Sequence, residues 1–358
     1  MAKLRRRDAR SWRCRFVWLA AAGALAVSTD APAQAPEGWA RALLIRHLGF
    51  SEKELRQAEQ GRPVVRSLET SVDREVAIFG AIRVRGRVED FLDRFRDIEQ
   101  FERGAGVLQI HKISDPPLLS DFSDLTLPDD DFEALPRCRV GDCLMKVDEY
   151  ALRRYQTEVD WTRPSARAQA NALTRQLLLE TVVAYQQGGN RALARLRDQR
   201  SPTAIGQEFM AMMEHAPYLE EFAPALGAYL REYPAARPPD VEEFFYWSKV
   251  NFGLRDTIRV NHVVICRDPA APGGVATASK MLWASHYFYT ALDLRFLVPA
   301  PGGAEKDAGF YLLALLRSRQ DGLTGTFGWV VRRRAVKGST QGLESYLRSV
   351  QRALEQPR

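Results

Sequence analysis

The spacing of hydrophobic residues changes several times along the chain, and each change predicts a different element. Residues 72–84 alternate between hydrophobic and polar positions, with Val76, Ile78 and Ile82 on one side, which is the period of a β-strand. From Arg87 the hydrophobic residues recur at helical spacing, and residues 107–113 alternate again. The pattern therefore predicts a strand, an amphipathic helix and a second strand.

The stretch 277–298 is the most strongly β-forming part of the chain. It is rich in aromatic and β-branched residues, contains no proline or glycine, and lies between loops that contain both. We interpret it as two strands or one long bent strand. Several polar residues are embedded in it: Lys280, Ser285, His286, Tyr287 and Tyr289. A few polar groups in an apolar β-rich run are typical of the wall of a ligand cavity, and also of an ordinary sheet.

The remaining pattern predicts more strands and a helical region between them. Residues 241–266 and 309–319 also have strand character, and consecutive strands with short loops favour an antiparallel meander. Residues 148–233 have helical character throughout, with breaks at Gly188, Gly189 and several prolines. Residues 323–354 are predicted as a long, mostly helical tail.

The order of these elements resembles START-like (polyketide cyclase-like) domains. The resemblance rests on the first strand, the turn Arg-Gly-Arg-Val-Glu-Asp-Phe-Leu at 85–92, the segment Asp-Ile-Glu-Gln-Phe at 97–101, and the final strand and helix. It covers about 70–115 and 242–355. It implies an α+β helix-grip fold, in which a curved antiparallel sheet is closed by a long C-terminal helix over a central cavity. The helical insertion departs from that pattern.

A second likeness concerns the segment Ala-Ser-His-Tyr-Phe at 284–288. The chain looks similar to uncharacterised secreted bacterial proteins that carry this segment, and that likeness implies no activity.

The first 33 residues have the features of a secretory signal peptide. A basic start precedes an apolar run of about 12 residues from Phe16 to Val27, and Ala31-Pro32-Ala33 fits a cleavage site. The run is short for a bilayer, although an uncleaved anchor is the alternative. We therefore expect a periplasmic or secreted protein of the cell envelope. We divide the chain into a signal peptide (1–33), a helical segment (34–70), two parts of a START-like domain (71–147 and 241–358) and a helical insertion (148–240).

Charge narrows the range of partners. The net charge of the 358-residue chain is +6, but residues 1–33 carry seven basic and two acidic side chains, which leaves about +1 for the remainder. A nearly neutral mature chain gives no reason to expect nucleic-acid binding. No second apolar stretch is long enough to span a membrane, and we interpret Arg332–Arg334 as a solvated helix face. A membrane patch there would need exposed apolar neighbours, so we expect membrane contact to be transient at most.

The cysteines predict one disulfide. Cys138 and Cys143 enclose the turn signal Gly141-Asp142, and in an oxidising compartment this pair is a good disulfide candidate. Two reduced thiols are the alternative, and a metal site would need further ligands near by. Cys266 ends an apolar run and is predicted to be a buried thiol.

No catalytic motif is present. The chain lacks a Gly-x-Ser-x-Gly elbow, a phosphate loop, a dinucleotide fingerprint and a His-Glu-x-x-His helix. His262 and His286 fall on strands that are possible neighbours, and with Asp256 or Asp293 they would form a metal site. Ordinary sheet histidines are the simpler interpretation, and we predict no metal and no cofactor.

Two arginines extend the apolar face of the last predicted strand. Arg317 and Arg319 share a side with Leu313 and Leu315 because side chains alternate along a strand. Two guanidinium groups there would bind an anionic head group. The alternative is that they pair with Asp321 or remain in solvent.

These observations favour a binding protein. We expect non-catalytic binding of an apolar or amphipathic small molecule, possibly lipid, in a cavity under the final helix. The predicted ligand-binding residues are Lys280, His286, Tyr287, Arg317 and Arg319. One alternative is an envelope enzyme that uses His286 with Tyr287 or Lys280 as acid–base groups. A second is a structural or protein-interaction module, and the oligomeric state stays open.

Overall fold

The computed structural model describes residues 41, 43–104, 106–253, 255–267, 274–300 and 309–356. These residues belong to one compact unit that spans Gln34–Arg358. The predicted signal peptide lies outside the described residues. None of the described helices is both long and apolar enough to cross a membrane.

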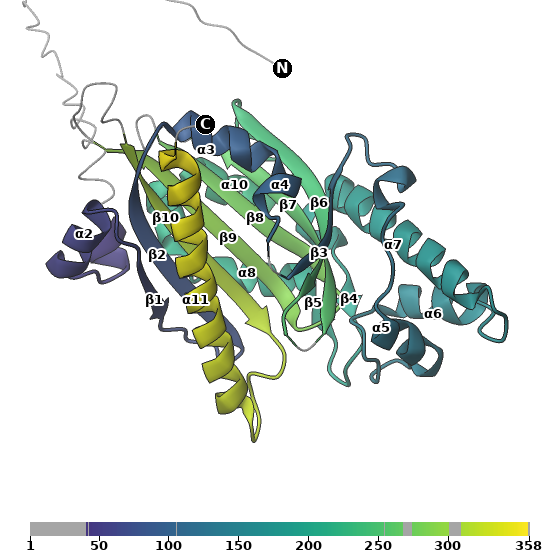
Figure 1. The fold of residues 1–358 in the computed structure, drawn as a ribbon. Helices are drawn as coiled ribbons and strands as arrows, with labels where there is room; N and C mark the ends of the chain where they lie inside the picture. The colour runs from purple at the N-terminus through teal and green to yellow at the C-terminus, as the bar shows by residue number, and fades with distance from the viewer. Residues whose placement is uncertain are drawn as a thin grey trace, which may run out of the picture. The chain divides into compact units, whose positions relative to one another are not determined.

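An eight-stranded antiparallel sheet organises the described chain (Figure 1). Its strands are β1 Val64–Leu68, β2 Glu75–Arg85, β3 Val107–Ile113, β6 Val241–Asn251, β7 Asp256–Cys266, β8 Val275–Ala284, β9 Phe288–Pro299 and β10 Gly309–Gln320. The spatial order is β1-β2-β10-β9-β8-β7-β6-β3. Strands β6 to β10 form the predicted meander, β2 pairs with β10, and β1 and β3 form the two edges.

Both faces of this sheet are buried in its central part, and β10 shows why. Leu312 and Ala314 face one hydrophobic cluster, whereas Leu313 and Leu315 face the other. A strand that is covered on both sides needs apolar residues at nearly every position, which explains the continuous run 310–316. We call the side of Leu312 and Ala314 the α11 face, and the side of Leu313 and Leu315 the insertion face.

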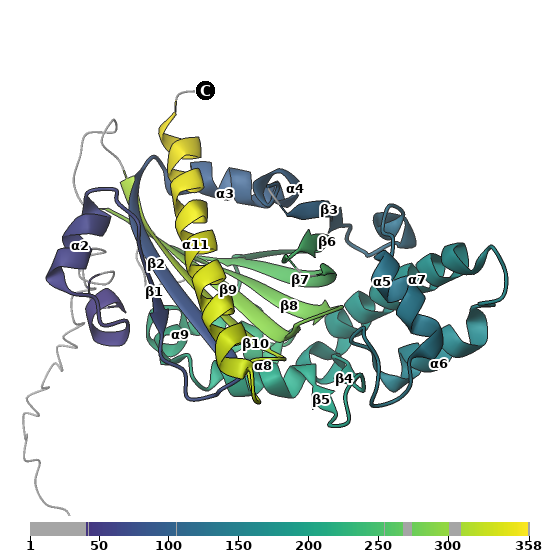
Figure 2. The same ribbon diagram turned by 60° about the horizontal axis from the view of Figure 1, so that its bottom comes forward.

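Three helices cover the α11 face. They are α3 Val88–Arg96, α4 Ile98–Phe101 and the long C-terminal helix α11 Gly328–Glu355. Helix α11 lies along β1 and β2 (Figure 2). Its close approach requires Gly80, because a Cβ atom there would lie 2.8 Å from a methyl carbon of Leu347 and 3.0 Å from one of Leu343. Both leucines are buried in the same cluster.

The segment between β3 and β6 covers the insertion face. Its α-helices are α5 Asp129–Ala134, α6 Glu149–Glu158, α7 Ala166–Gly188, α8 Ile205–Met213, α9 Pro217–Phe222 and α10 Pro224–Glu232. Short turns η2 Leu119–Phe122, η3 Leu135–Arg137 and η4 Gly189–Ala192 and a small hairpin of β4 Arg195–Leu196 and β5 Thr203–Ala204 connect them. Tyr185 of α7 and Phe209 of α8 belong to the same hydrophobic cluster as Leu313. The insertion therefore shares one core with the sheet.

The coarse fold prediction is confirmed. The chain is α+β, with a large antiparallel sheet and a long C-terminal helix. The predicted run 277–298 is two strands, separated by a turn at Ser285–Tyr287. The N-terminal segment contains η1 Leu43–His47, a π-helical turn, and α2 Glu52–Glu59. Strand β1 was not predicted, because Arg66 and Ser67 interrupt its hydrophobic pattern.

Candidate functional site

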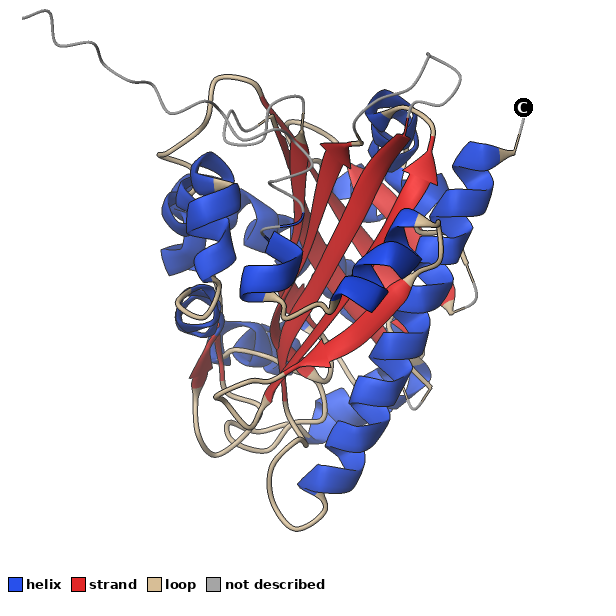
Figure 3. Ribbon diagram, turned by 90° about the vertical axis from the view of Figure 1, so that its left-hand side faces the viewer, coloured by secondary structure: helices blue, strands red, loops and turns tan. Residues whose placement is uncertain are grey.

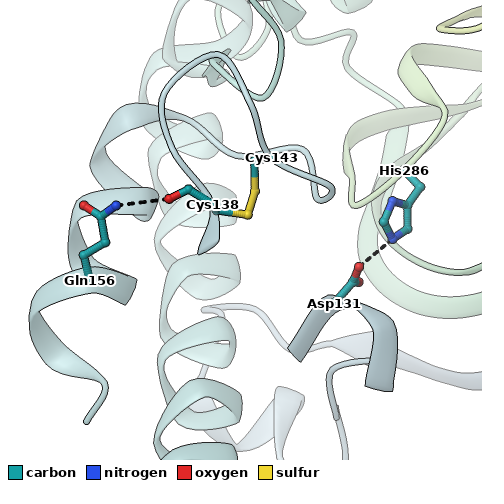
Figure 4. The surroundings of a disulfide bond; sticks show 5 residues. All are labelled: Asp131, Cys138, Cys143, Gln156 and His286. Atoms are coloured by element: carbon teal, nitrogen blue, oxygen red, sulfur yellow. Dashed lines mark hydrogen bonds and ion pairs between the residues drawn. A yellow bond between two sulfur atoms is a disulfide. The ribbon is translucent and has the colours of Figure 1, made fainter. Parts of the chain in front are cut away.

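The turn between β8 and β9 places His286 against the insertion. His286 Nε2 lies 2.7 Å from Oδ1 of Asp131 in α5, and the two side chains are 5% and 0% exposed (Figure 4). Neither carboxylate oxygen of Asp131 makes an aligned hydrogen bond. The adjacent Tyr287 has a positive φ of 60°, a conformation that is costly for a bulky L-residue. Of the predicted ligand-binding residues, His286 and Tyr287 therefore lie together at this turn.

The predicted disulfide lies next to this pair. Cys138 and Cys143 are bonded, and Nε2 of Gln156 in α6 donates to the Cys138 carbonyl oxygen at 3.2 Å (Figure 4). The disulfide-bonded loop follows α5 and η3 in the chain. The hydrogen bond from Gln156 therefore links α6 to the segment that carries Asp131. Cys266 is buried at the end of β7, as predicted, and is not part of this disulfide.

Lys280 lies in a different place, inside the contact between β8 and the insertion. Its amine donates to the hydroxyl of Tyr185 at 3.1 Å and to Oδ1 of Asn190. It also lies 3.9 Å from the ring centroid of Phe209. Lys280 is fully buried, and burial lowers its pKa well below the usual range. Among the described residues, no hydrogen bond or ion pair joins Lys280 to His286.

The hydrogen bonds continue from Tyr185 toward β6. The Tyr185 hydroxyl is 3.3 Å from Nδ1 of His262, whose Nε2 is 3.0 Å from Glu243. Tyr229 donates to the same carboxylate at 2.7 Å, and Arg237 pairs with it. Burial raises the pKa of Glu243, but the hydrogen bonds from His262, Tyr229 and Arg237 outweigh it and bring the pKa to about 2. This network joins α7, α10 and the sheet through buried polar groups.

Arg317 and Arg319 form a third cluster on the insertion face. Their Nε atoms lie 3.2 and 3.0 Å from the two carboxylate oxygens of Glu75 in β2. Arg319 also pairs with Glu208 of α8 at 3.1 Å, and Arg317 donates to the carbonyl oxygen of His215. The expectation that this face lies under the final helix is therefore wrong, because α11 covers the opposite face.

The alternative that Arg317 and Arg319 pair with Asp321 was also wrong. Asp321 pairs instead with Lys146, at 2.7 Å. A single strand's alternation cannot distinguish the two arrangements, since it shows which residues share a side but not which layer covers that side.

The α11 face holds a buried arginine that forms no salt bridge with a carboxylate of the described residues, although the charges of Asp293 and Glu102 favour its protonated form. Arg295 of β9 is 6% exposed, and its Nε donates to the Tyr346 hydroxyl of α11 at 2.8 Å. Its guanidinium carbon lies 5.1 and 5.2 Å from the ring centroids of Phe95 and Tyr346. Nη1 of Arg295 is buried without a hydrogen-bond partner. Within the described part of the chain, no carboxylate forms an ion pair with it.

Further polar groups surround Arg295 on the same face. Asp293 precedes it by two positions along β9. Burial raises the pKa of this carboxyl, and the nearby charges of Arg295 and Arg259 oppose that shift. Arg259 of β7 donates to Ser248 at 2.8 Å and pairs with Glu102 at 3.1 Å. Two more buried polar atoms here lack partners: Nδ2 of Asn261 and Oγ1 of Thr277. Unpartnered buried polar atoms are unusual in folded proteins, and a bound water or ion is one explanation for them.

A groove lies between α3–α4 and α11, and Tyr346 connects it to Arg295. Its volume is about 490 Å³. Phe91, Phe101, Tyr346, Val350 and Leu354 provide the apolar part of its lining, and Asp93, Arg94, Asp97 and Arg103 provide the charged part. Tyr346 belongs to both features, because its ring lines the groove while its hydroxyl accepts from Arg295. A second hollow of about 310 Å³ lies between α6, α7 and Trp283, lined by Met145, Tyr155, Thr174 and Leu178 among others.

The metal alternative finds no support in the described residues. They contain no group of three or more His, Cys, Asp or Glu side chains that would hold a metal ion. His262 faces Glu243 and His286 faces Asp131, rather than the carboxylates considered from the sequence.

Comparison with known proteins does not assign the chain to a family. No protein-family model matches the chain, and no curated protein matches it.

Proposed function

We propose that the protein binds an amphipathic small molecule with an anionic head group, in the groove between α3–α4 and α11. The observation that carries this proposal is the buried guanidinium of Arg295, whose Nη1 has no hydrogen-bond partner and whose Nε donates to Tyr346 in the lining of the groove. A buried charge is costly unless it is paired. A carboxylate or phosphate of the ligand would supply the partner, and the groove has the size of a small-molecule site.

The arrangement supports a START-like fold for this binding role. A long C-terminal helix lies over an antiparallel sheet, and the groove opens beside that helix. The Cys138–Cys143 disulfide fits an oxidising compartment, which supports a location in the cell envelope. Lys280, Arg317 and Arg319 have protein partners on the insertion face, so we assign the ligand head group to Arg295 instead.

Two probes of equal chain length test this proposal. Dodecanoate carries an anionic head group and dodecanol a neutral one, and titration calorimetry compares their binding to the purified chain. We expect dodecanoate to bind more tightly. Arg295→Met should weaken dodecanoate binding by about 1–3 kcal/mol, the value of a charge-assisted hydrogen bond, and leave dodecanol binding unchanged.

Arg317→Met is the matched control, because it removes a buried arginine from the opposite face. It leaves Glu75 with one fewer partner, so it should lower stability while dodecanoate binding persists. If Arg317→Met abolishes binding and Arg295→Met does not, the site lies on the insertion face. If neither probe binds and native mass spectrometry of envelope-purified protein finds only the bare chain, the structural-module alternative is favoured.

A further inference from the structure

The start of α11 carries an exposed apolar patch. Phe327 and Trp329 are 75% and 67% exposed, the largest values for large hydrophobic side chains in the described chain, and Val331 is 43% exposed. Single exposed hydrophobic residues are common, but three exposed ones around the first turn of a helix form an apolar tip, which marks an interaction site. The sequence alone did not reveal this patch, because it does not show exposure.

Trp329 continues the buried stripe of the same helix. Trp329 precedes Leu347 by 18 residues, which is about five helical turns, so the two side chains share one side of α11. Leu347 is fully buried against Gly80 of the sheet. The first turns of α11 extend past the ends of the strands that the helix crosses (Figure 3). Trp329 is therefore on the core-facing side but beyond the core, and packing within the chain does not account for it.

Basic residues adjoin the patch. Arg333, Arg334 and Lys337 are exposed, and the segment from Gly328 to Gly338 contains no acidic residue. Arg332 is held beside them, since it donates to the carbonyl oxygen of Asp73 at 2.7 Å and to Thr70 at 2.8 Å.

No acidic residue balances the charge of this helix end. The first turn of α11 contains none, so the partial positive charge of the amino end adds to the basic side chains of the next two turns. A negatively charged partner would complement this charge.

We propose that this tip, Phe327–Lys337, docks onto an anionic phospholipid surface. The rings of Phe327 and Trp329 would enter the interfacial layer, where aromatic side chains are favoured. Arg333, Arg334 and Lys337 would contact lipid phosphates, with a contribution from each basic residue near a negatively charged surface. Docking of this kind is peripheral, and it does not rest on the proposed ligand site.

A lipid surface fits this tip better than a folded protein does. Stable protein–protein interfaces bury well over about 1,000 Å² of complementary surface, whereas the tip is one projecting helix end. Interfacial membrane binding needs only a few apolar side chains beside basic ones.

Vesicle co-sedimentation of the mature chain tests this proposal. One set of vesicles contains phosphatidylcholine alone, and the other contains phosphatidylcholine and phosphatidylglycerol in equal amounts. We expect binding to the anionic vesicles only, with a marked loss at about 1 M salt, where charges are screened within about 3 Å. The double substitution Arg333→Gln and Arg334→Gln should lower the partition coefficient about tenfold or more, and Trp329→Ser should lower it similarly.

Two exposed residues outside the tip provide controls. Phe252→Ala removes an aromatic side chain that is 45% exposed, and Arg348→Gln removes an exposed charge from the same helix. Both should bind like the wild type, and all variants should keep the wild-type melting temperature. Equal binding of Trp329→Ser and wild type would overturn the proposal. So would equal binding to the neutral vesicles, or a wild-type dimer in solution that Trp329→Ser abolishes, because the occupant would then be a second copy.

Discussion

Lys280 is fully buried, and the side chains that its amine contacts carry no negative charge. Its amine contacts a tyrosine hydroxyl, an amide oxygen and two aromatic rings. Burial lowers its pKa well below the usual range, since desolvation disfavours the charged amine. In the unfolded chain this amine titrates near about 10.4. At a pH between the folded-state and unfolded-state pKa values, Lys280 is protonated in the unfolded chain but not in the folded one. The free energy of unfolding therefore rises with pH in this range.

Lys280→Met should remove that dependence. We expect the unfolding free energy of the wild type to rise from about pH 7 to about pH 9, relative to that of the variant. We also expect the variant to be at least as stable at pH 7, because an apolar side chain replaces a poorly compensated charge. Urea unfolding at the two pH values measures this. Lys146→Met is the contrasting variant: Lys146 pairs with Asp198 and Asp321, and its loss should destabilise the chain. Parallel pH profiles for wild type and Lys280→Met would refute the prediction.

The contact between α11 and β2 depends on the absence of one side chain. A Cβ atom at position 80 would lie within 3.0 Å of carbon atoms of Leu343 and Leu347, which is closer than packed atoms come. Gly80→Ala should therefore destabilise the chain by about 1–3 kcal/mol, the usual cost of overpacking. Leu347→Ala alone should cost about 2–5 kcal/mol, because it leaves a cavity.

The double variant of Gly80→Ala and Leu347→Ala tests whether these two costs are coupled. The alanine at 80 partly fills the space that Leu347 leaves, so the double variant should lose less stability than the sum of the single variants. Chemical denaturation of all four proteins gives the coupling energy. Additive losses would mean that α11 shifts away from β2 as a whole.

Strands were predictable where the local hydrophobic pattern is strong, whether it alternates, as in residues 107–113, or is continuously apolar, as in residues 310–316. Residues 107–113 and 309–319 were predicted within one residue of the observed β3 and β10. The sequence did not predict which helices cover each face of the sheet, because this depends on contacts between residues far apart in the sequence. Asp293 and Arg295 illustrate a signal that was present but not used. They alternate with leucines inside an apolar strand, which marks a polar stripe on one side of a buried sheet.

The insertion and the sheet form one structural unit in the described chain. Buried residues of α7, α8 and α10 share a hydrophobic cluster with β9 and β10. Polar networks cross the same boundary, through Lys280 to Tyr185 and through Arg319 to Glu208. Without the helices, the insertion face would expose a large apolar surface and unpaired buried charges, so the insertion cannot act as a separable domain.

We therefore expect the mature chain to unfold in one cooperative transition. Calorimetry should give equal calorimetric and van't Hoff enthalpies, and fluorescence and circular dichroism should report the same midpoint. A chain that lacks residues 148–240 should fail to fold, because strands β9 and β10 lose the layer that covers one face. Phe209→Ala is a sensitive probe, since Phe209 is fully buried at this boundary and should cost about 3–5 kcal/mol. It should lower the midpoint measured by every method. Two separated transitions, with Phe209→Ala moving only one of them, would show that the insertion folds independently of the sheet.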